Sequence, residues 1–259
     1  MKKNLDSQFE NKYTIDLNAD LGEGGLDDEA ILACVSSANI ACGGHAGDSA
    51  SMRTAVRAAM RHQVAIGAHP SFVDRENFGR SAMHLPAAEV MAMVSAQIRA
   101  LQAIAAEEGA RLLHVKPHGA LYNQAARDPM LARQIVQAVI EVDPRLCVVA
   151  LSGSALISAA KQAGLAVAEE VFADRRYMPD GTLAPRNLPG ATIDDVTLAL
   201  QQVMRLIEDG QVLALDGQLL TLKVDTICLH GDGAHALELA RLIRFTLEQK
   251  HILIGAAVR

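Results

Sequence analysis

Short apolar runs alternate with longer amphipathic stretches along the whole chain. The apolar runs predict strands near residues 13–19, 38–42, 64–69, 112–117, 146–151, 166–172 and 226–230. The amphipathic stretches predict helices near residues 28–37, 49–62, 86–108, 129–141, 154–163, 193–209 and 233–249. Seven alternating strand–helix units indicate a parallel α/β architecture. Because no linker divides these units, we expect a single domain over residues 1–259, with 1–12 as a flexible N-terminal extension.

Ionisable side chains lie at or just beyond the ends of most of these strands. They are Asp16, Asp20, His45, His69, Lys116, His118, Asp174, Arg175, Arg176, His230 and Asp232. In a (β/α) barrel the carboxyl ends of all strands meet at one mouth, where active sites lie. An open sheet would bring only two or three of them together, at its switch point. The distribution therefore favours a distorted seven-stranded (β/α) barrel.

Three of these segments have further features that suit a binding site. Asp16, Asn18 and Asp20 share one face of the first strand, because side chains two apart point the same way. The segment that follows the second strand is glycine-rich, which permits close approach of the backbone to a ligand. Lys116 lies within an apolar strand, where a lysine is costly to bury without a purpose.

Structural roles compete with functional ones at several positions. Asp48 precedes a helix and is a candidate N-cap. His114 lies early in its strand and is a candidate core histidine held by hydrogen bonds. Arg175 and Arg176 also suit ion pairs at the surface.

Composition narrows the classes of function. The chain has 259 residues and a formal net charge of −6, and only 3% of its residues are aromatic. It therefore lacks the basic and aromatic surfaces that nucleic acids require, and no nucleic-acid partner is expected. Its four cysteines include no C-x-x-C pair, and the N-terminus has no apolar signal segment. No apolar run is long enough to span a bilayer, so a cytoplasmic protein without a membrane partner is predicted.

Six segments resemble the ordered motifs of the LamB/YcsF family. These segments are IDLNADLGEG, SANIACGGHAGD, IGAHPSFVD, VKPHGALYN, EVFADRRY with the later APRNLPGA, and ICLHGDGAHA. The resemblance implies a seven-stranded barrel similar to that of glycoside hydrolases and deacetylases. It also implies the role of the A component of an ATP-dependent 5-oxoprolinase. That enzyme cleaves 5-oxo-L-proline to L-glutamate with hydrolysis of ATP to ADP and phosphate, in a complex with subunits B and C.

The sequence departs from the family pattern around the expected pocket. The segment GEGGLDDEA is shorter than in the family, and Gly44 stands where an aromatic residue is usual. Ser49 replaces a usual proline, and Ser81 replaces a usual arginine. We expect these changes to alter the rim of the pocket and to bear on the choice of substrate.

The resemblance and the chemistry of the side chains together suggest roles. Candidate catalytic residues are Asp16, Asp20, His45, His69, Lys116, His118 and His230, with the four histidines as proton carriers. Candidate substrate-binding residues are Asn18, Asn39, Asp174, Arg175, Arg176 and Asp232. Three cationic side chains, Lys116, Arg175 and Arg176, suit the oxygens of a phosphoryl group. Asp16 and Asp20 are candidate ligands for Mg²⁺, which is expected to accompany the nucleotide.

The site of ATP stays open at this point, because the chain contains no G-x-x-x-x-G-K-[ST] loop. The backbone around Gly43, Gly44 and Gly47 is a candidate phosphate cradle, and the alternative is a nucleotide held partly by a partner protein. Two other functions also stay open. One is a metal-dependent hydrolase or deacetylase that works without ATP, and the other is a non-catalytic component that binds a metabolite.

Overall fold

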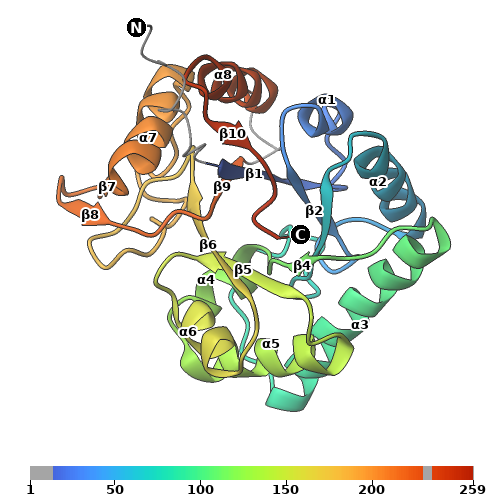
Figure 1. Cartoon of the computed structure of the whole chain (residues 1–259). Coiled ribbons are helices and arrows are strands. Elements are labelled where there is room, and N and C mark those ends of the chain that lie inside the picture. Colours follow the sequence, from blue (N-terminus) through green and yellow to red (C-terminus); the bar gives the residue numbers. More distant parts are fainter. Residues whose placement is uncertain (1–13, 230–234, 259) are drawn as a thin grey trace, which may run out of the picture.

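Seven parallel strands close into a barrel in the computed structural model, which describes residues 14–229 and 235–258 (Figure 1). The barrel strands are β1 (Thr14–Leu21), β2 (Ser37–Ala41), β3 (Ala65–His69), β4 (His114–Val115), β5 (Cys147–Leu151), β6 (Val167–Phe172) and β9 (Thr226–Leu229). Each strand pairs in parallel with the next, and β1 pairs with both β2 and β9. The predicted seven-stranded barrel is therefore confirmed.

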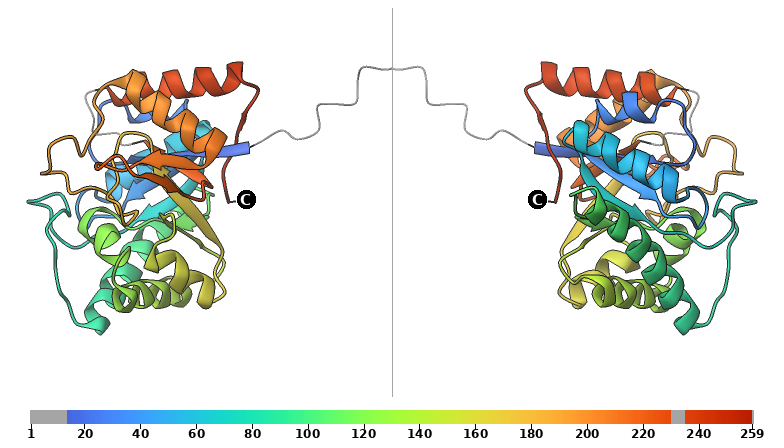
Figure 2. Two further views of the ribbon diagram at one scale, coloured as in Figure 1. Left: turned by 90° about the vertical axis from the view of Figure 1, so that its left-hand side faces the viewer. Right: turned by 90° about the vertical axis from the view of Figure 1, so that its right-hand side faces the viewer.

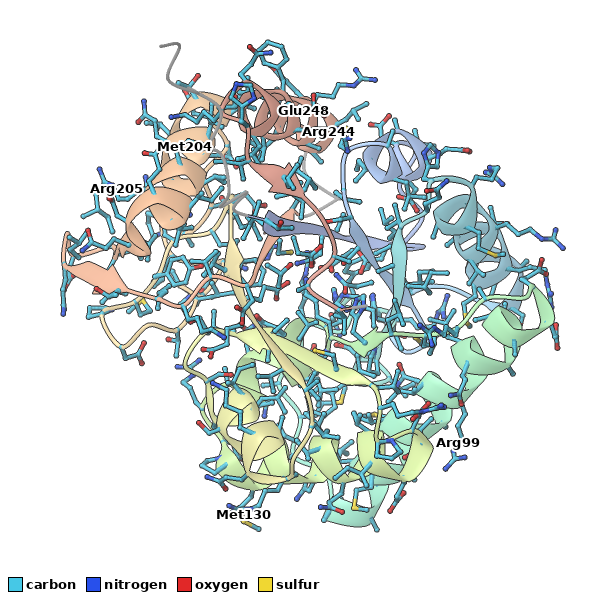
Figure 3. The ribbon with its side chains drawn as sticks, viewed as in Figure 1. Arg99, Met130, Met204, Arg205, Arg244 and Glu248 are labelled. Carbon is cyan, nitrogen blue, oxygen red and sulfur yellow. The ribbon has the colours of Figure 1, made fainter. Side chains whose placement is uncertain are left out.

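Helices surround the barrel. They are α1 (Asp28–Leu32), α2 (Ser49–Arg61), α3 (Ala87–Glu107), α4 (Gly119–Ala125), α5 (Pro129–Val142), α6 (Ala155–Gln162), α7 (Val196–Asp209) and α8 (Ala236–Gln249). Of these, α4 lies at the carboxyl end of the barrel. Charged side chains occupy their outer faces, as in α8, where Arg244 and Glu248 form a 2.9 Å ion pair one turn apart (Figure 3). Within the described residues, no helix is long and apolar enough to cross a membrane.

Side-chain caps set several of the helix boundaries. Asp128 caps α5 by accepting hydrogen bonds from the backbone N–H groups of Met130 and Leu131. Asp48 likewise forms a capping box with Ser51 at the start of α2. Its role as an N-cap is thereby confirmed.

Short elements were missed or misjudged because they are too brief to show a periodic pattern. The first helix ends at Leu32 rather than at residue 37, because Ser37 is already the first residue of β2. The short helix α4 directly follows the site residues of β4. An antiparallel hairpin of β7 (Gln211–Leu213) and β8 (Leu219–Thr221) also escaped prediction. The same holds for β10 (Leu253–Ile254), which pairs with the start of β1.

Along β1, the side chains that point into the barrel are polar and those that point toward the helices are apolar. Ile15, Leu17 and Ala19 are buried in the hydrophobic core together with the helices. The alternate residue Asn18 instead contacts side chains from strands on both sides of the interior. Because neighbouring residues on a strand face opposite ways, the apolar set that anchors the helices also directs the polar set inward.

The two ends of the barrel differ. The start of β1 and the segment around β10 lie at one end, and the long loop after β3 projects from the other (Figure 2). The second end carries the carboxyl ends of the parallel strands. It is therefore the end at which an active site is expected.

Candidate active site at the carboxyl end of the barrel

A buried lysine forms the floor of the site. Lys116 follows β4 and is only 2% exposed. Its Nζ atom lies 2.8 Å from Asp20 Oδ1 on β1 and 2.9 Å from Glu170 Oε1 on β6. Burial opposes the ammonium charge, but Asp20, Cys228 and Glu170 hold the pKa of Lys116 well above its usual value. The lysine is thus a fixed cation held by strands on either side of the barrel.

A layer of amides lies beneath this lysine. The Oδ1 atom of Asn18 accepts hydrogen bonds from Asn39 at 2.8 Å and from Lys116 at 3.2 Å. Asn39 also donates to Asp20 Oδ1 at 2.9 Å and accepts from His114 Nε2 at 2.8 Å. Burial lowers the pKa of His114 to about 3, so this imidazole is neutral. His114 is therefore the hydrogen-bonded core histidine that the sequence left as an alternative.

Three imidazoles and a carboxylate converge beside the lysine. His45, His69 and His118 each bring one ring nitrogen to the Oε1 atom of Glu23, at 2.8, 3.8 and 3.4 Å respectively. The ring of His45 stacks on that of His118, with centroids 3.6 Å apart and planes 4° apart. The ring of His69 stands nearly perpendicular to that of His118, at 83°. These groups are the cluster among the described residues that suits a metal ion.

Backbone carbonyls fix where the hydrogens of this cluster must lie. His69 Nδ1 donates to the carbonyl of Lys116 at 2.7 Å, and His118 Nε2 donates to the carbonyl of Phe78 at 3.0 Å. The remaining nitrogens, His69 Nε2 and His118 Nδ1, face one another at 3.0 Å. One proton must lie between them, because two facing lone pairs repel. Without a cation between them, these two nitrogens can form a hydrogen bond only if one of them is protonated.

The surroundings shift the pKa values of the two imidazoles in opposite directions. Burial opposes a charge there, but the Asp20 carboxylate raises the pKa of His69. Burial and the two neighbouring imidazoles lower the pKa of His118. Both directions favour His69 as the donor and His118 as the acceptor at this contact.

The loop after β3 holds the histidines in place. Phe78 adopts a left-handed backbone conformation with φ 55°, which directs its carbonyl to His118. A Cβ atom on the next residue, Gly79, would lie 2.8 Å from the Cβ of His45 and 3.1 Å from the ring of His118. Only glycine fits there, because the loop passes directly over the stacked rings.

A cavity of about 470 Å³ opens above the lysine and the histidines. Its charged lining residues are Asp20, Glu23, Arg80, Lys116, Arg127, Arg175 and Arg186. Both carboxylates are already engaged, Asp20 by Lys116 and Glu23 by His45. Four arginines thus face the cavity in a protein whose net charge is −6, and the cavity suits an anionic ligand.

Arg175 is the most buried of these arginines. It donates to the carbonyl of Ala184 at 2.6 Å, whereas its Nε atom has no hydrogen-bond partner among the described residues. Burial, with Arg186 as a further cause, lowers the pKa of Arg175 to about 10. It stays charged at neutral pH, and a bound anion would relieve the crowding of positive charge.

Comparison with known proteins bears on these features. The LamB/YcsF family pattern matches residues 15–258. This chain belongs to the LamB/YcsF family. It is similar to the lactam utilization protein from Thermus thermophilus, with 45% identity and a TM-score of 0.87, over 94% of this chain and 99% of that one.

A more distant similarity of this LamB/YcsF chain concerns only the fold. The peptidoglycan deacetylase PdaC from Bacillus subtilis aligns with a TM-score of 0.50 over 95% of this chain and 88% of that one. The two are only 14% identical. A deacetylase-like barrel is therefore shared, as the sequence predicted.

The placement of Asp16 at the mouth was wrong. Its Oδ1 atom accepts hydrogen bonds from Ser36 at 2.6 Å and Ser37 at 2.8 Å, and its register partner, Thr226, is the first residue of β9. Asp16 thus lies near the amino end of β1, four residues and about 13 Å along the strand from Asp20. The two carboxylates do not fit a shared Mg²⁺ site, and Asp20 Oδ1 is already occupied by Lys116.

The glycines of the predicted phosphate cradle lie apart from the main cavity. Gly43, Gly44 and Gly47 do not line the main cavity. The amide of Gly43 donates to the carbonyl of Ala46, and the carbonyls of Gly43 and Gly47 accept from Arg75. A Cβ on Gly44 would lie within 2.5 Å of Ser71 and Gln97. The glycines permit tight packing that places His45, and the aromatic residue usual in the family would not fit at Gly44 without rearrangement.

Other predicted residues fall in different places. Asp174 and Arg176, on either side of Arg175, do not line the cavity. Arg176 pairs through its backbone with Ala184 and Ala191. His230 and Asp232 lie outside the described residues, so their predicted roles stay predictions.

Five functional candidates were missed: Glu23, Arg80, Arg127, Glu170 and Arg186. Two of them left a signal in the sequence. Glu170 lies in the apolar strand β6, where a buried carboxylate needs a cation as its partner. Lys116 had in turn been predicted to be a buried cation, which needs an anion as its partner. Glu23 stands in the glycine-rich turn directly after β1. The three arginines come from loops, which show no periodicity.

Proposed function

We propose that this chain is the A component of an ATP-dependent 5-oxoprolinase that acts in the cytoplasm. The reaction converts 5-oxo-L-proline, ATP and two waters to L-glutamate, ADP and phosphate. Membership of the LamB/YcsF family and the likeness to a lactam utilization protein support a lactam as substrate. Subunits B and C are the proposed partners, with Mg²⁺ entering as part of the nucleotide substrate.

The observation that carries the proposal is the fixed Lys116 on the floor of a cavity with four arginines. A lactam resists hydrolysis because its amide is unstrained. Transfer of a phosphoryl group to the amide oxygen makes the ring carbon open to attack by water and lets the C–N bond break. Such transfer depends on positioned positive charge, since the protein has little covalent chemistry to perform.

The cavity offers separate places for the two anionic groups involved. Lys116 lies at the floor, where charge on a transferring phosphoryl group would be met by a cation with no reorganisation. Arg175 and Arg186 lie in the wall and suit the carboxylate of the substrate. Asp20 and Glu170 hold the lysine in position, which gives each carboxylate a supporting role.

The test is co-expression of this chain with candidate B and C subunits, followed by assay of glutamate and phosphate release from 5-oxoproline. We expect equal release of both products, and only when ATP is present. The chain alone should turn over poorly. Release of glutamate without ATP would overturn the ATP-coupled function.

That contrary result would favour a second candidate, hydrolysis of an amide by a bound metal ion without ATP. The observation behind it is the convergence of Glu23, His69 and His118 at the edge of the cavity. Metal-bound water is a strong nucleophile at neutral pH. Omission of ATP from the assay therefore separates the two functions directly.

A further inference from the structure

We propose that His69 Nε2, His118 Nδ1 and Glu23 Oε1 bind a divalent transition-metal ion at the edge of the cavity. Asp20 lies beside them as an additional ligand, with Oδ2 3.4 Å from His69 Nε2. This inference does not depend on the proposed reaction. Imidazole nitrogen with carboxylate oxygen favours ions such as Zn²⁺, Mn²⁺, Fe²⁺ or Co²⁺ over Mg²⁺, which prefers oxygen.

The spacing of the ligand atoms fits such an ion. The nitrogens of His69 and His118 are 3.0 Å apart, and Glu23 Oε1 is 3.8 Å and 3.4 Å from them. Metal–ligand bonds of about 2.0–2.2 Å at ordinary coordination angles place neighbouring ligand atoms roughly 3–3.5 Å apart. An ion therefore needs only small movements of these side chains.

The hydrogen bonds of the two imidazoles are those of metal ligands. Each ring donates its other N–H to a backbone carbonyl, His69 to Lys116 and His118 to Phe78. This arrangement fixes the tautomer that directs a lone pair at the proposed ion. The rings are nearly perpendicular, so both can point at one position. A cation there would replace the shared proton between the facing nitrogens.

The remaining neighbours support the ion without binding it. His45 donates to Glu23 at 2.8 Å and stacks on His118, which orients both ligands. Because the Nε2 atom of His45 already donates to Glu23, His45 is not among the proposed ligands. Glu23 and Asp20 supply the negative charge that balances a divalent ion. All four proposed ligands line the cavity, which leaves a face of the ion open to substrate.

An occupied site would change the roles of the histidines. His69 and His118 would cease to be proton carriers, because their facing nitrogens would be bound to the ion. His45 would act through Glu23 as a positioning residue. The chemistry that the ion would supply is polarisation of a carbonyl or phosphoryl oxygen or activation of water.

The experiment measures metal binding rather than turnover. The full chain is freed of metal with a chelator and titrated with Co²⁺, whose visible absorption reports coordination by nitrogen and oxygen. We expect one Co²⁺ per chain, displaced by Zn²⁺ but not by excess Mg²⁺. Glu23→Gln and His69→Gln should each weaken binding by about 100-fold or more, since loss of even a supporting partner costs roughly 10–100-fold.

A matched control is His62→Gln, at the C-terminal end of α2 and hence at the opposite end of the barrel. It should leave the titration unchanged. Circular dichroism establishes whether each variant is folded. If His69→Gln does not fold, the Glu23→Gln variant, whose substitution lies in a loop, still tests whether these residues bind the ion. The inference is overturned by wild-type protein that binds no Co²⁺, or by folded Glu23→Gln protein that binds it equally well.

Discussion

The ammonium group of Lys116 lies 2.9 Å from the carboxylate of Glu170, and both side chains are buried in the barrel. The pair joins the end of β4 to β6 across the interior. Tyr122 donates to the second oxygen of Glu170 at 2.7 Å, so the carboxylate is fully engaged. This relationship makes Lys116 a structural residue as well as a candidate catalytic one, and the two roles need separate tests.

Lys116→Met should destabilise the fold, because it leaves two buried carboxylates without their cation. Breaking a buried pair by removal of one partner typically costs about 3–5 kcal/mol. The free energy of unfolding, measured by urea denaturation, checks this. Addition of Glu170→Gln should recover part of the loss. Lys161→Met is the control: its partner is Glu169 at 2.7 Å, but the lysine side chain is half exposed, and a cost of about 0–1 kcal/mol is expected.

The catalytic role of Lys116 is tested in the charge-balanced background. Relative to Glu170→Gln alone, the double variant Lys116→Met/Glu170→Gln should lose roughly 10²-fold or more in 5-oxoproline-dependent ATP hydrolysis. That is the loss typical of removing one preorganised charge-stabilising group. The assay uses the complex with subunits B and C. Near-normal coupled turnover by a folded double variant would remove Lys116 from the proposed reaction.

Arg175 and Arg176 are adjacent in sequence but should differ in ligand binding. Arg175 lines the cavity, whereas Arg176 does not. Arg175→Met should weaken binding of the anionic substrates by about 10–100-fold, since a hydrogen bond to a charged group is worth about 1.5–3 kcal/mol. Calorimetric titration of the assembled complex with 5-oxoproline and with ATP measures the change. Equal effects of Arg175→Met and Arg176→Met would contradict the assignment of the cavity as the site.

Asp16→Asn should preserve activity and change how stability depends on pH. Burial raises the pKa of Asp16 above its ordinary value of 3.8. A carboxyl with a raised pKa contributes stability that is present below pH 3.8 and is lost as the pH rises through its value in the folded state. An asparagine side chain does not titrate, so the variant does not lose this stability as the pH rises. Its Oδ1 atom can still accept hydrogen bonds from the hydroxyls of Ser36 and Ser37.

Denaturation at pH 4 and pH 7 measures the effect of this substitution. The stability of Asp16→Asn relative to the wild type should increase between the two values. An increase in the stability of the wild type relative to the variant between pH 4 and pH 7 would contradict the raised pKa of Asp16. Loss of activity in a stable variant would instead return Asp16 to the catalytic site.

The pattern of apolar and polar residues was enough to predict the barrel and to locate most of the polar residues at the strand ends. Seven apolar runs that are separated by amphipathic helices admit few other arrangements, because each run must be covered and each helix must bury one face. Strand parity correctly placed Asn18 and Asp20 on the inner side. The cost of burying Lys116 correctly indicated a built site, since a lysine survives there only with partners.

Which of these residues contact one another depends on the folded arrangement of the strands and loops. Parity gives the face of a strand but not the depth, so Asp16 and Asp20 looked equivalent although they lie near opposite ends of β1. Closure of the barrel set Glu170 against Lys116, and the loop after β3 completed the histidine cluster with the carbonyl of Phe78. Such contacts join residues far apart in sequence. They depend on register, loop conformation and closure of the sheet, which no local pattern of hydrophobic and polar residues records.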